Sequence, residues 1–266
     1  IEVVCDDTIF ADISALDNLE VFIGLSDVKD CFHRMRVPSW LARYFAWDAV
    51  TAATVGMTGV ELEGKVLAAN DLIFPCAGSL CQGFSWSLCF AQKANEYLAG
   101  SISPLTDAKL ASDRGGPVIL HVSKDVDSSA HFYVYVDNLG VISVDESEVK
   151  VAMEELQACF NSKGLELHGS EITQGSVEAL GCVLDGNRMR SRCNAKRLWR
   201  VHHGIKGLLN RGRCSGKALE IVIGHCTFLG LISRGSLACF HSVYSFIQKN
   251  YGQVASLWQS VVNELT

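Results

Sequence analysis

Two carboxylates that follow strand-like runs are the residues best suited to metal chemistry in this chain. Asp27 directly follows the apolar run 21–26, and Asp137 lies within the strand-forming segment 131–143. Because Asp137–Asn138 is a polar pair between two such runs, it predicts a β-hairpin with one carboxylate at its tip. A lone turn aspartate usually bonds only its own backbone. Two strand-borne carboxylates, in contrast, suit Mg²⁺ held together with substrate phosphates in a two-metal phosphoryl-transfer site.

Four short motifs follow one another along the chain. They are SDVKDCF at 26–32, LCQGFS at 80–85, YVDN at 135–138 and ALGCVL at 179–184. In this order they resemble the motifs of reverse transcriptases from retrotransposons and retroviruses, over about residues 20 to 245. The resemblance implies an α+β fold of the right-hand polymerase type. Its palm is an antiparallel sheet with backing helices, accompanied by partial fingers and a helical thumb.

The resemblance also assigns catalytic roles. Asp27, Asp137 and Asn138 fall on the catalytic positions, and the implied metal ligands are Asp27, Val28 and Asp137. They would bind two Mg²⁺ ions, or Mn²⁺ in their place. Asn138 stands where the family has a second adjacent aspartate. Because its amide is neutral, we expect weaker metal binding than in the family pattern.

A nucleotide site is implied next to these positions. Its members are Asp30, Cys31, Phe32, Gln82 and Gly83. Backbone N–H groups of Asp30 and Cys31 would bind the triphosphate. Phe32 would lie under the sugar and exclude a 2′-hydroxyl, with core packing as an equal alternative. Gln82–Gly83 would pack against nucleotide and template; taken alone, the pair predicts only a helix N-terminus.

Charge is distributed unevenly. The chain has a net charge of −6, yet all 29 acidic residues lie outside the window 187–219. That window holds His202, His203 and the basic residues Arg188, Arg190, Arg192, Lys196, Arg197, Arg200, Lys206, Arg211, Arg213 and Lys217. This asymmetry favours a face that binds nucleic-acid phosphates without reading sequence. A simple solvated face is the ordinary alternative.

The elements that must position these residues divide the chain into two regions. Residues 1–186 are predicted as partial fingers and palm, with a fingers insertion at about 34–74. Residues 187–266 are predicted as a helical thumb or connection-like region. Expected strands lie at 21–26, 44–47, 66–67, 72–74 and 165–167, with a small hairpin at 179–186. Expected helices span 13–19, 85–98, 105–112, 146–163, 196–210, 215–232 and 236–251.

Several residues are predicted to begin or end these helices. Ser143 and Glu146 form a predicted capping box, and Gly164 a predicted helix end. Ser215 and Ser236 are predicted N-caps.

The cysteines indicate a reducing environment. None of the eleven forms a C-x-x-C pair. We therefore expect small buried thiols, including Cys76, Cys81, Cys89, Cys159, Cys182, Cys226 and Cys239, in an intracellular protein of nucleus or cytoplasm. The spacing disfavours a zinc site. No apolar run reaches transmembrane length, and no membrane partner is expected. The N-terminal sequence does not resemble a signal peptide, and we expect a segment of a longer chain, such as a polyprotein with further domains.

The resemblance implies an RNA-directed DNA polymerase of a mobile element. Its partners would be an RNA or DNA template, a DNA primer and dNTPs. One alternative is a catalytically impaired or domesticated nucleic-acid-binding domain. It is favoured by Asn138, by a loop at 168–173 without lysine, and by the missing basic fingers strands. A small α/β enzyme of another class is disfavoured, because the chain has no Gly-rich phosphate loop and no G-x-S-x-G motif.

Overall fold

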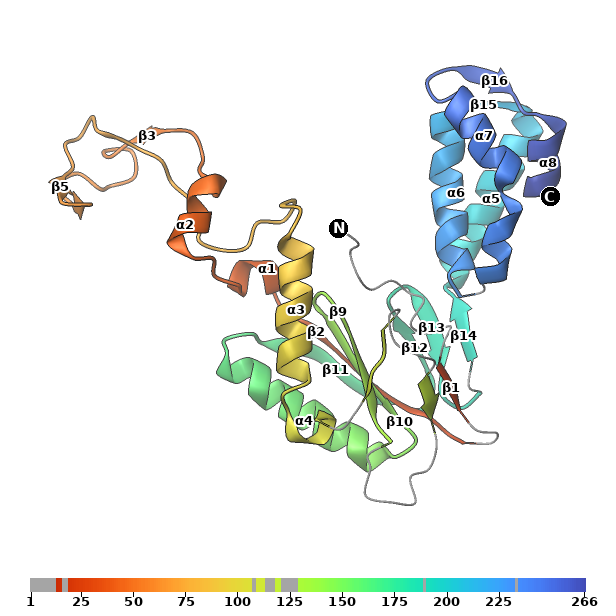
Figure 1. The fold of residues 1–266 in the computed structure, drawn as a ribbon, viewed down its shortest axis with the longest axis horizontal. Coiled ribbons are helices and arrows are strands. Elements are labelled where there is room, and N and C mark those ends of the chain that lie inside the picture. The colour runs from red at the N-terminus through yellow and green to blue at the C-terminus, as the bar shows by residue number, and fades with distance from the viewer. Residues whose placement is uncertain are drawn as a thin grey trace.

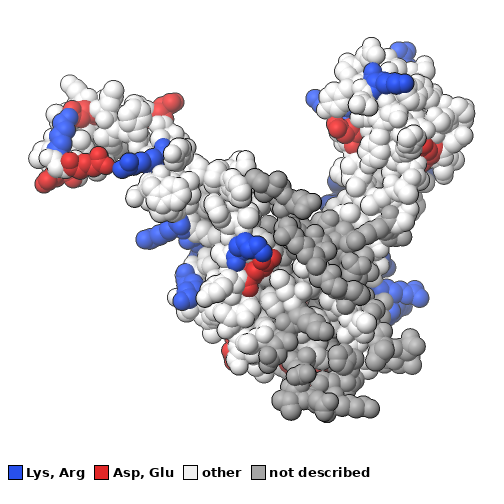
Figure 2. Space-filling view, viewed as in Figure 1, with Lys and Arg blue, Asp and Glu red and all other residues white. Residues whose placement is uncertain are grey.

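Two arms rise from a body built around one sheet (Figure 1). The computed structural model describes residues 13–15, 19–106, 109–112, 118–120, 129–188, 190–232 and 234–266. One arm is an irregular extension of about residues 38–77, and the other is a bundle of helices from 195 to 266. Figure 2 shows open space between the arms above the body.

The body is organised around a five-stranded sheet. Its order is β11 (Leu167–Thr173), β2 (Phe22–Val28), β10 (Asn138–Ser143), β9 (His131–Tyr135) and β7 (Lys109–Leu110). β2 pairs antiparallel with both β10 and β11, and only β7 joins in parallel. The continuous apolar run of β2 agrees with this central place, because both faces of the sheet are covered. The predicted strand and hairpin are confirmed.

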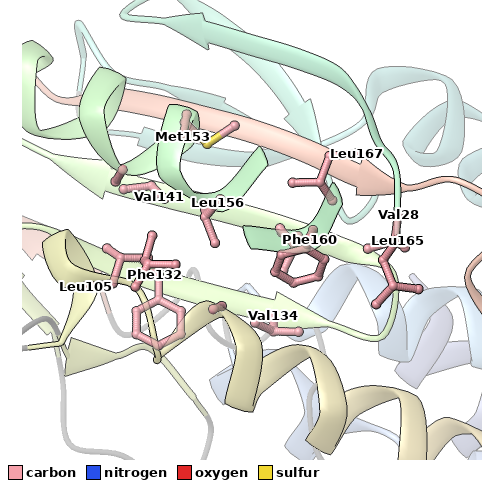
Figure 3. Packing of buried hydrophobic residues seen from close by; sticks show 14 of the residues in the cluster. Val28, Leu105, Phe132, Val134, Val141, Met153, Leu156, Phe160, Leu165 and Leu167 are labelled. Atoms are coloured by element: carbon pink, nitrogen blue, oxygen red, sulfur yellow. The ribbon is translucent and has the colours of Figure 1, made fainter. Parts of the chain in front are cut away.

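Two helices cover one face of this sheet. They are α3 (Ser87–Ala99) and α4 (Glu146–Ser162). Figure 3 shows Leu156 and Phe160 of α4 packing among sheet residues such as Val141 and Leu167. Full burial of side chains of this size stabilises by about 1.5–3 kcal/mol each. Both helices were predicted within two residues of their ends.

The other face is covered by a three-stranded sheet. It contains β12 (Ser176–Ala179), β13 (Cys182–Asp185) and β14 (Arg190–Cys193), and its core residues pack against Tyr133 and Ile142. The predicted small hairpin is β12–β13. β14 lies in the region predicted as helical, so the helices begin only after it.

Helix α4 starts two residues later than the predicted capping box at Ser143 implies. Its N-cap is Asp145, whose side chain accepts a hydrogen bond from the Ser147 N–H. Ser143 instead donates to Glu148 Oε2 at 2.7 Å. Both serine and aspartate satisfy the local capping rule, so spacing alone did not distinguish them. Gly164 follows the helix with φ +76°, as its predicted role requires.

The extension contains only short elements. After α1 (Cys31–Arg34) come α2 (Ser39–Ala42), the 3-10 turn η2 (Arg43–Phe45), β3 (Val50–Thr51), β4 (Glu61–Leu62), β5 (Lys65–Val66) and β6 (Leu72–Ile73). The strand predicted at 44–47 is wrong, because those residues form η2 and a single bridge from Ala46 to Cys76. Large side chains such as Trp40, Tyr44 and Phe74 are exposed here.

The helical arm has its own core. It comprises α5 (Ala195–Arg211), β15 (Arg213–Ser215), α6 (Gly216–Gly230), η4 (Arg234–Cys239), α7 (His241–Lys249), β16 (Val254–Ser256) and α8 (Gln259–Leu265). Leu219, Val243 and Phe246 are completely buried in it. The Ser215 side chain caps α6, as predicted. Ser236 is not an N-cap, because it lies within η4 and the next helix starts at His241.

Three further expectations change. Residues Ile13–Ala15 form β1, which pairs with β8 (Val118–Leu120), where a helix over 13–19 was predicted. The helix predicted at 105–112 is replaced by η3 (Ser103–Leu105) and β7, with 107–108 outside the described residues. Among the described cysteines, only Cys31, Cys182 and Cys214 are buried. Burial was wrongly expected for Cys76, Cys81, Cys89, Cys159, Cys226 and Cys239; Cys76 and Cys239 are exposed and the others partly buried.

Within the described ranges, no helix combines the length and apolarity needed to cross a membrane.

Candidate active site

Asp27 and Asp137 lie side by side at one edge of the central sheet. Asp27 is the next-to-last residue of β2, and Asp137 is in the tight turn between β9 and β10. The Val28 N–H donates a hydrogen bond to the Asp137 carbonyl at 2.8 Å, which ties the two segments together. The turn end of the β9–β10 hairpin points toward the space between the arms (Figure 1).

Asn138 is in the strand rather than the turn. It opens β10 and is paired with Asp27 across the ladder, and its Nδ2 donates to Asp137 Oδ1 at 3.1 Å. The residues of the turn are Val136 and Asp137. The predicted turn was therefore displaced by one residue, while the carboxylate at the hairpin tip is confirmed in place.

Burial and the charge of Asp137 both act on the Asp27 carboxylate. Burial raises the pKa of Asp27 above its usual value, and the nearby negative charge of Asp137 raises it further. His168 and the Val28 N–H act in the opposite direction. Two oxygen-donor groups that repel one another suit a hard divalent cation. Among the described residues no group of three His, Cys, Asp or Glu side chains could hold a metal, so water and phosphate would complete its shell.

His168 is a neighbour of Asp27 that was not predicted as a site residue. Its Nδ1 donates to the Asp27 carbonyl at 3.0 Å, and its Nε2 lies 3.7 Å from Asp27 Oδ2. The β2–β11 register shifts between His168 and Glu171, at a bulge. A bulge changes the direction of nearby side chains, so the position of His168 could not be predicted from the alternating pattern of a regular strand.

The predicted nucleotide residues fall into two groups. Asp30 has φ +52° and precedes α1, so β2 passes directly into the helix that begins at Cys31. Cys31 is buried, which raises its thiol pKa to about 11, and Phe32 packs partly buried against the core. In contrast, Gln82 and Gly83 are exposed before α3. Among the described residues no hydrogen bond or ion pair joins them to the two aspartates.

Two buried amides on α3 were missed. Gln92 and Asn95 are 4% and 0% exposed, and both hydrogen-bond the backbone of Val136 in the turn. In the sequence they are two amides three residues apart in an otherwise apolar helix face, which was the available signal.

Two cavities meet at Asn138. The smaller, about 210 Å³, is lined by Asp27, His168, Glu171 and Glu178 among others. The larger, about 440 Å³, extends to Leu180, Gly181, Arg197 and Phe228. It thus connects the hairpin turn with the β12–β13 loop and the helical arm. The Arg197 guanidinium carbon lies 3.6 Å from the centre of the Phe228 ring.

The predicted nucleic-acid-binding residues form an exposed basic face. They lie on the β13–β14 turn, β14, α5, β15 and the start of α6, and all are exposed except the partly buried Arg197. In the described part of the chain none of the ten forms an ion pair. Exposed Trp199 stands beside His202 and His203 on α5. Because no carboxylate of the described residues pairs with these cations, they remain available for anions.

No family model and no curated protein matches the chain. Among solved structures, the foamy viral protease-reverse transcriptase in complex with RNA/DNA hybrid is similar at a TM-score of 0.57 and 14% identity. The match covers 96% of this chain and 27% of that protein. The chain therefore has a reverse-transcriptase-like fold and spans about a quarter of the foamy viral chain.

Two telomerase structures are more distant. The one from Candida albicans with telomeric RNA has a TM-score of 0.39 at 14% identity, over 85% of this chain and 40% of that chain. The apo enzyme from Candida tropicalis has 0.36 at 14% identity, over 66% and 36%. Scores this low add nothing to the fold assignment.

Proposed function

We propose that this chain is the polymerase region of a reverse transcriptase, an RNA-directed DNA polymerase of a mobile element. The observation that supports the proposal is the hydrogen bond from Val28 to Asp137, which sets Asp137 beside Asp27 on a reverse-transcriptase-like fold. In this proposal residues 1–186 are partial fingers and palm, and residues 187–266 are the thumb.

In this proposal different side chains bind the metal ions, the nucleotide and the nucleic acid. Asp27 and Asp137 would hold two Mg²⁺ ions, or Mn²⁺, and Asn138 would orient Asp137 through its amide. When bound, the ions supply charge neutralisation and activation of the primer 3′-hydroxyl. Phe32 and the start of α1 would bind the dNTP. The basic face would hold phosphates of a primer and an RNA or DNA template, which fixes register without reading bases.

Asn138 supports a second candidate function, a nucleic-acid-binding domain without polymerase activity. Asn138 occupies the position opposite Asp27, so the edge of the sheet carries two carboxylates and a neutral amide. A weaker charge cluster lowers metal affinity, while the exposed basic face is unaffected.

Primer extension on an RNA template tests the first proposal. The unaltered chain should extend the primer with Mg²⁺ or Mn²⁺. Asp27→Asn and Asp137→Asn should each lower the rate about 100-fold or more, because several kcal/mol of charge stabilisation is lost. Asp48→Asn, which changes an exposed carboxylate on the extension, is the matched control and should extend normally.

The outcomes separate the two candidates. Extension that survives both active-site substitutions would contradict the assigned site. Absence of extension together with salt-sensitive duplex binding would favour the binding domain. Absence of both activities would reject both proposals.

A further inference from the structure

We propose that Gln92 and Asn95 of α3 are positioning residues that fix the Asp137 turn relative to Asp27. The inference rests on the proposed function, because it concerns the same two carboxylates. Neither amide contacts Asp27 or Asp137 directly in the hydrogen bonds of the described residues. Their effect would pass through the backbone of Val136.

Gln92 binds the last part of β9 and the turn with opposite ends of its amide. Its Oε1 accepts the Val136 N–H at 2.7 Å, and its Nε2 donates to the Val134 carbonyl at 2.8 Å. The same Nε2 also donates to Glu96 Oε1 at 2.8 Å. These contacts use both the donor and the acceptor of the amide, so its orientation is fixed.

Asn95 joins the turn to the other aspartate-bearing segment. Its Nδ2 donates to the Val136 carbonyl at 2.6 Å and also to Cys31 Sγ at 3.6 Å. Cys31 opens α1, four residues after Asp27. One buried side chain thus contacts the two segments that carry the carboxylates.

Val136 itself needs this support. Its φ is +56°, an uncommon conformation for a β-branched residue. Strained residues of this kind persist when the surroundings over-determine them, and here both polar groups of Val136 are held by α3. From Val136 the constraint continues to Asp137, whose carbonyl accepts the Val28 N–H.

The orphaned oxygen of Asn95 supports a role beyond packing. Asn95 Oδ1 is buried and has no hydrogen-bond partner among the residues that the structure describes. Leaving a buried acceptor unpaired is costly, and each such case in a native structure needs an explanation. Positioning of the turn by the other end of the same amide would explain why a polar side chain is kept at a completely buried position.

The test uses substitutions by apolar side chains of similar shape that remove the hydrogen bonds, namely Gln92→Met and Asn95→Leu. Asn95→Leu removes the unpaired acceptor Asn95 Oδ1, but it also leaves the Val136 carbonyl without its hydrogen bond from Asn95 Nδ2. Its thermal stability should therefore stay close to that of the unaltered chain, which separates positioning from folding. Gln157→Met on the exposed face of α4 is the matched control.

Binding of Mn²⁺ to the chain without nucleic acid, followed by electron paramagnetic resonance, is the first readout. We expect each α3 variant to bind Mn²⁺ about 10- to 100-fold more weakly, the usual effect of losing an outer support of metal ligands. The part of the bound-Mn²⁺ signal that is lost in Asp27→Asn belongs to this site. Hydrogen exchange of the turn amides should accelerate in Gln92→Met, because the Val136 N–H loses its acceptor.

The second readout is kinetic. A positioning role lowers kcat and raises the Mg²⁺ concentration for half-maximal rate, while KM for the duplex stays constant. Folded variants with unchanged Mn²⁺ affinity would overturn the inference, and so would absence of Mn²⁺ binding by the unaltered chain. If Mn²⁺ binding depends on Asp27, Gln92 and Asn95 but no primer is extended, the polymerase proposal fails and the positioning role stands.

Discussion

Asn138 is the cross-strand partner of Asp27 in the β2–β10 ladder, and it also donates its side-chain amide to Asp137. The neutral residue therefore bridges the positions of the two carboxylates. In the absence of metal it reduces their repulsion, because it supplies a donor where a third acid would add charge. Stability without metal and affinity for metal are thus opposed at this position.

Asn138→Asp should lower the stability of the metal-free chain and raise its affinity for metal. Without divalent metal, we expect a loss of about 1 kcal/mol in stability from added repulsion. With Mg²⁺, the thermal midpoint should recover and primer extension should increase. Differential scanning fluorimetry across a Mg²⁺ titration measures the thermal midpoint, and a primer-extension assay measures the activity. Asn70→Asp, at an exposed site in the extension, should show neither change; equal behaviour of the two variants would contradict the prediction.

The raised pKa of Asp27 predicts the direction of a pH effect on stability. The folded chain binds a proton at Asp27 more tightly than the unfolded chain, whose carboxyl has its ordinary pKa of 3.8. The free energy of unfolding should therefore fall as pH rises through the raised pKa, and this loss persists at neutral pH. Asp27→Asn should be slightly more stable than the parent at pH 7, and the difference should vanish below about pH 4.

Asp145 provides a control of opposite sign. Hydrogen bonds from Ser147 lower the pKa of Asp145, so its contribution is present above pH 3.8 and lost in acid. Asp145→Ala should cost about 1 kcal/mol at pH 7, the usual value of an N-cap. Thermal unfolding of the three proteins from pH 3 to 7 makes the comparison. A stability gain for Asp27→Asn that persists undiminished in acid would show that titration is not its cause.

Gly140→Ala should destabilise the sheet beside the site. A Cβ at Gly140 would lie 2.0 Å from Tyr133 Cε1, and Tyr133 is 2% exposed and unable to move aside. Such overpacking costs about 1–3 kcal/mol. Gly207→Ala on α5 is the control, because no described atom beyond the helix's own backbone and its chain neighbours lies within 4 Å of the added Cβ. The helix should gain about 0.5–1 kcal/mol. Urea unfolding measures the free energy of unfolding, which should fall in Gly140→Ala and rise in Gly207→Ala.

Removing charge from α5 should weaken duplex binding in a salt-dependent way. Lys196, Arg200 and Lys206 are exposed and have no ion-pair partner among the described residues. Their joint replacement by glutamine should reduce the slope of log K against log salt by about 2–3, since each phosphate contact contributes about 0.7–0.9. Lys150→Gln on α4 removes one positive charge outside this region and should leave the slope unchanged. A slope equal to that of the parent would exclude this face from binding.

The strong apolar runs allowed the strands and their carboxylates to be predicted, and local rules failed where tertiary contacts overrode them. The turn was placed at Asp137–Asn138 because these residues are a polar pair between two strand-forming runs. A β-branched residue such as Val136 rarely adopts a positive φ. In the structure Val136 takes that conformation, supported by Gln92 and Asn95 from a helix more than 40 residues earlier. No short-range pattern carries that information. Likewise the extension has strands of two residues each, too short for periodicity to show.

The central place of β2 also sets the order of events during synthesis. Ser26 of β2 meets Ser170 of β11, 144 positions later in the chain. At typical translation rates, roughly 7 to 30 seconds separate the emergence of these partners. Until β10 is made, β2 lacks both of the strands that it pairs with in the sheet, and Asp137 is not yet present beside Asp27; β11 is made later still. Assembly of the Asp27–Asp137 pair is therefore a long-range step that must wait for synthesis of the β9–β10 hairpin.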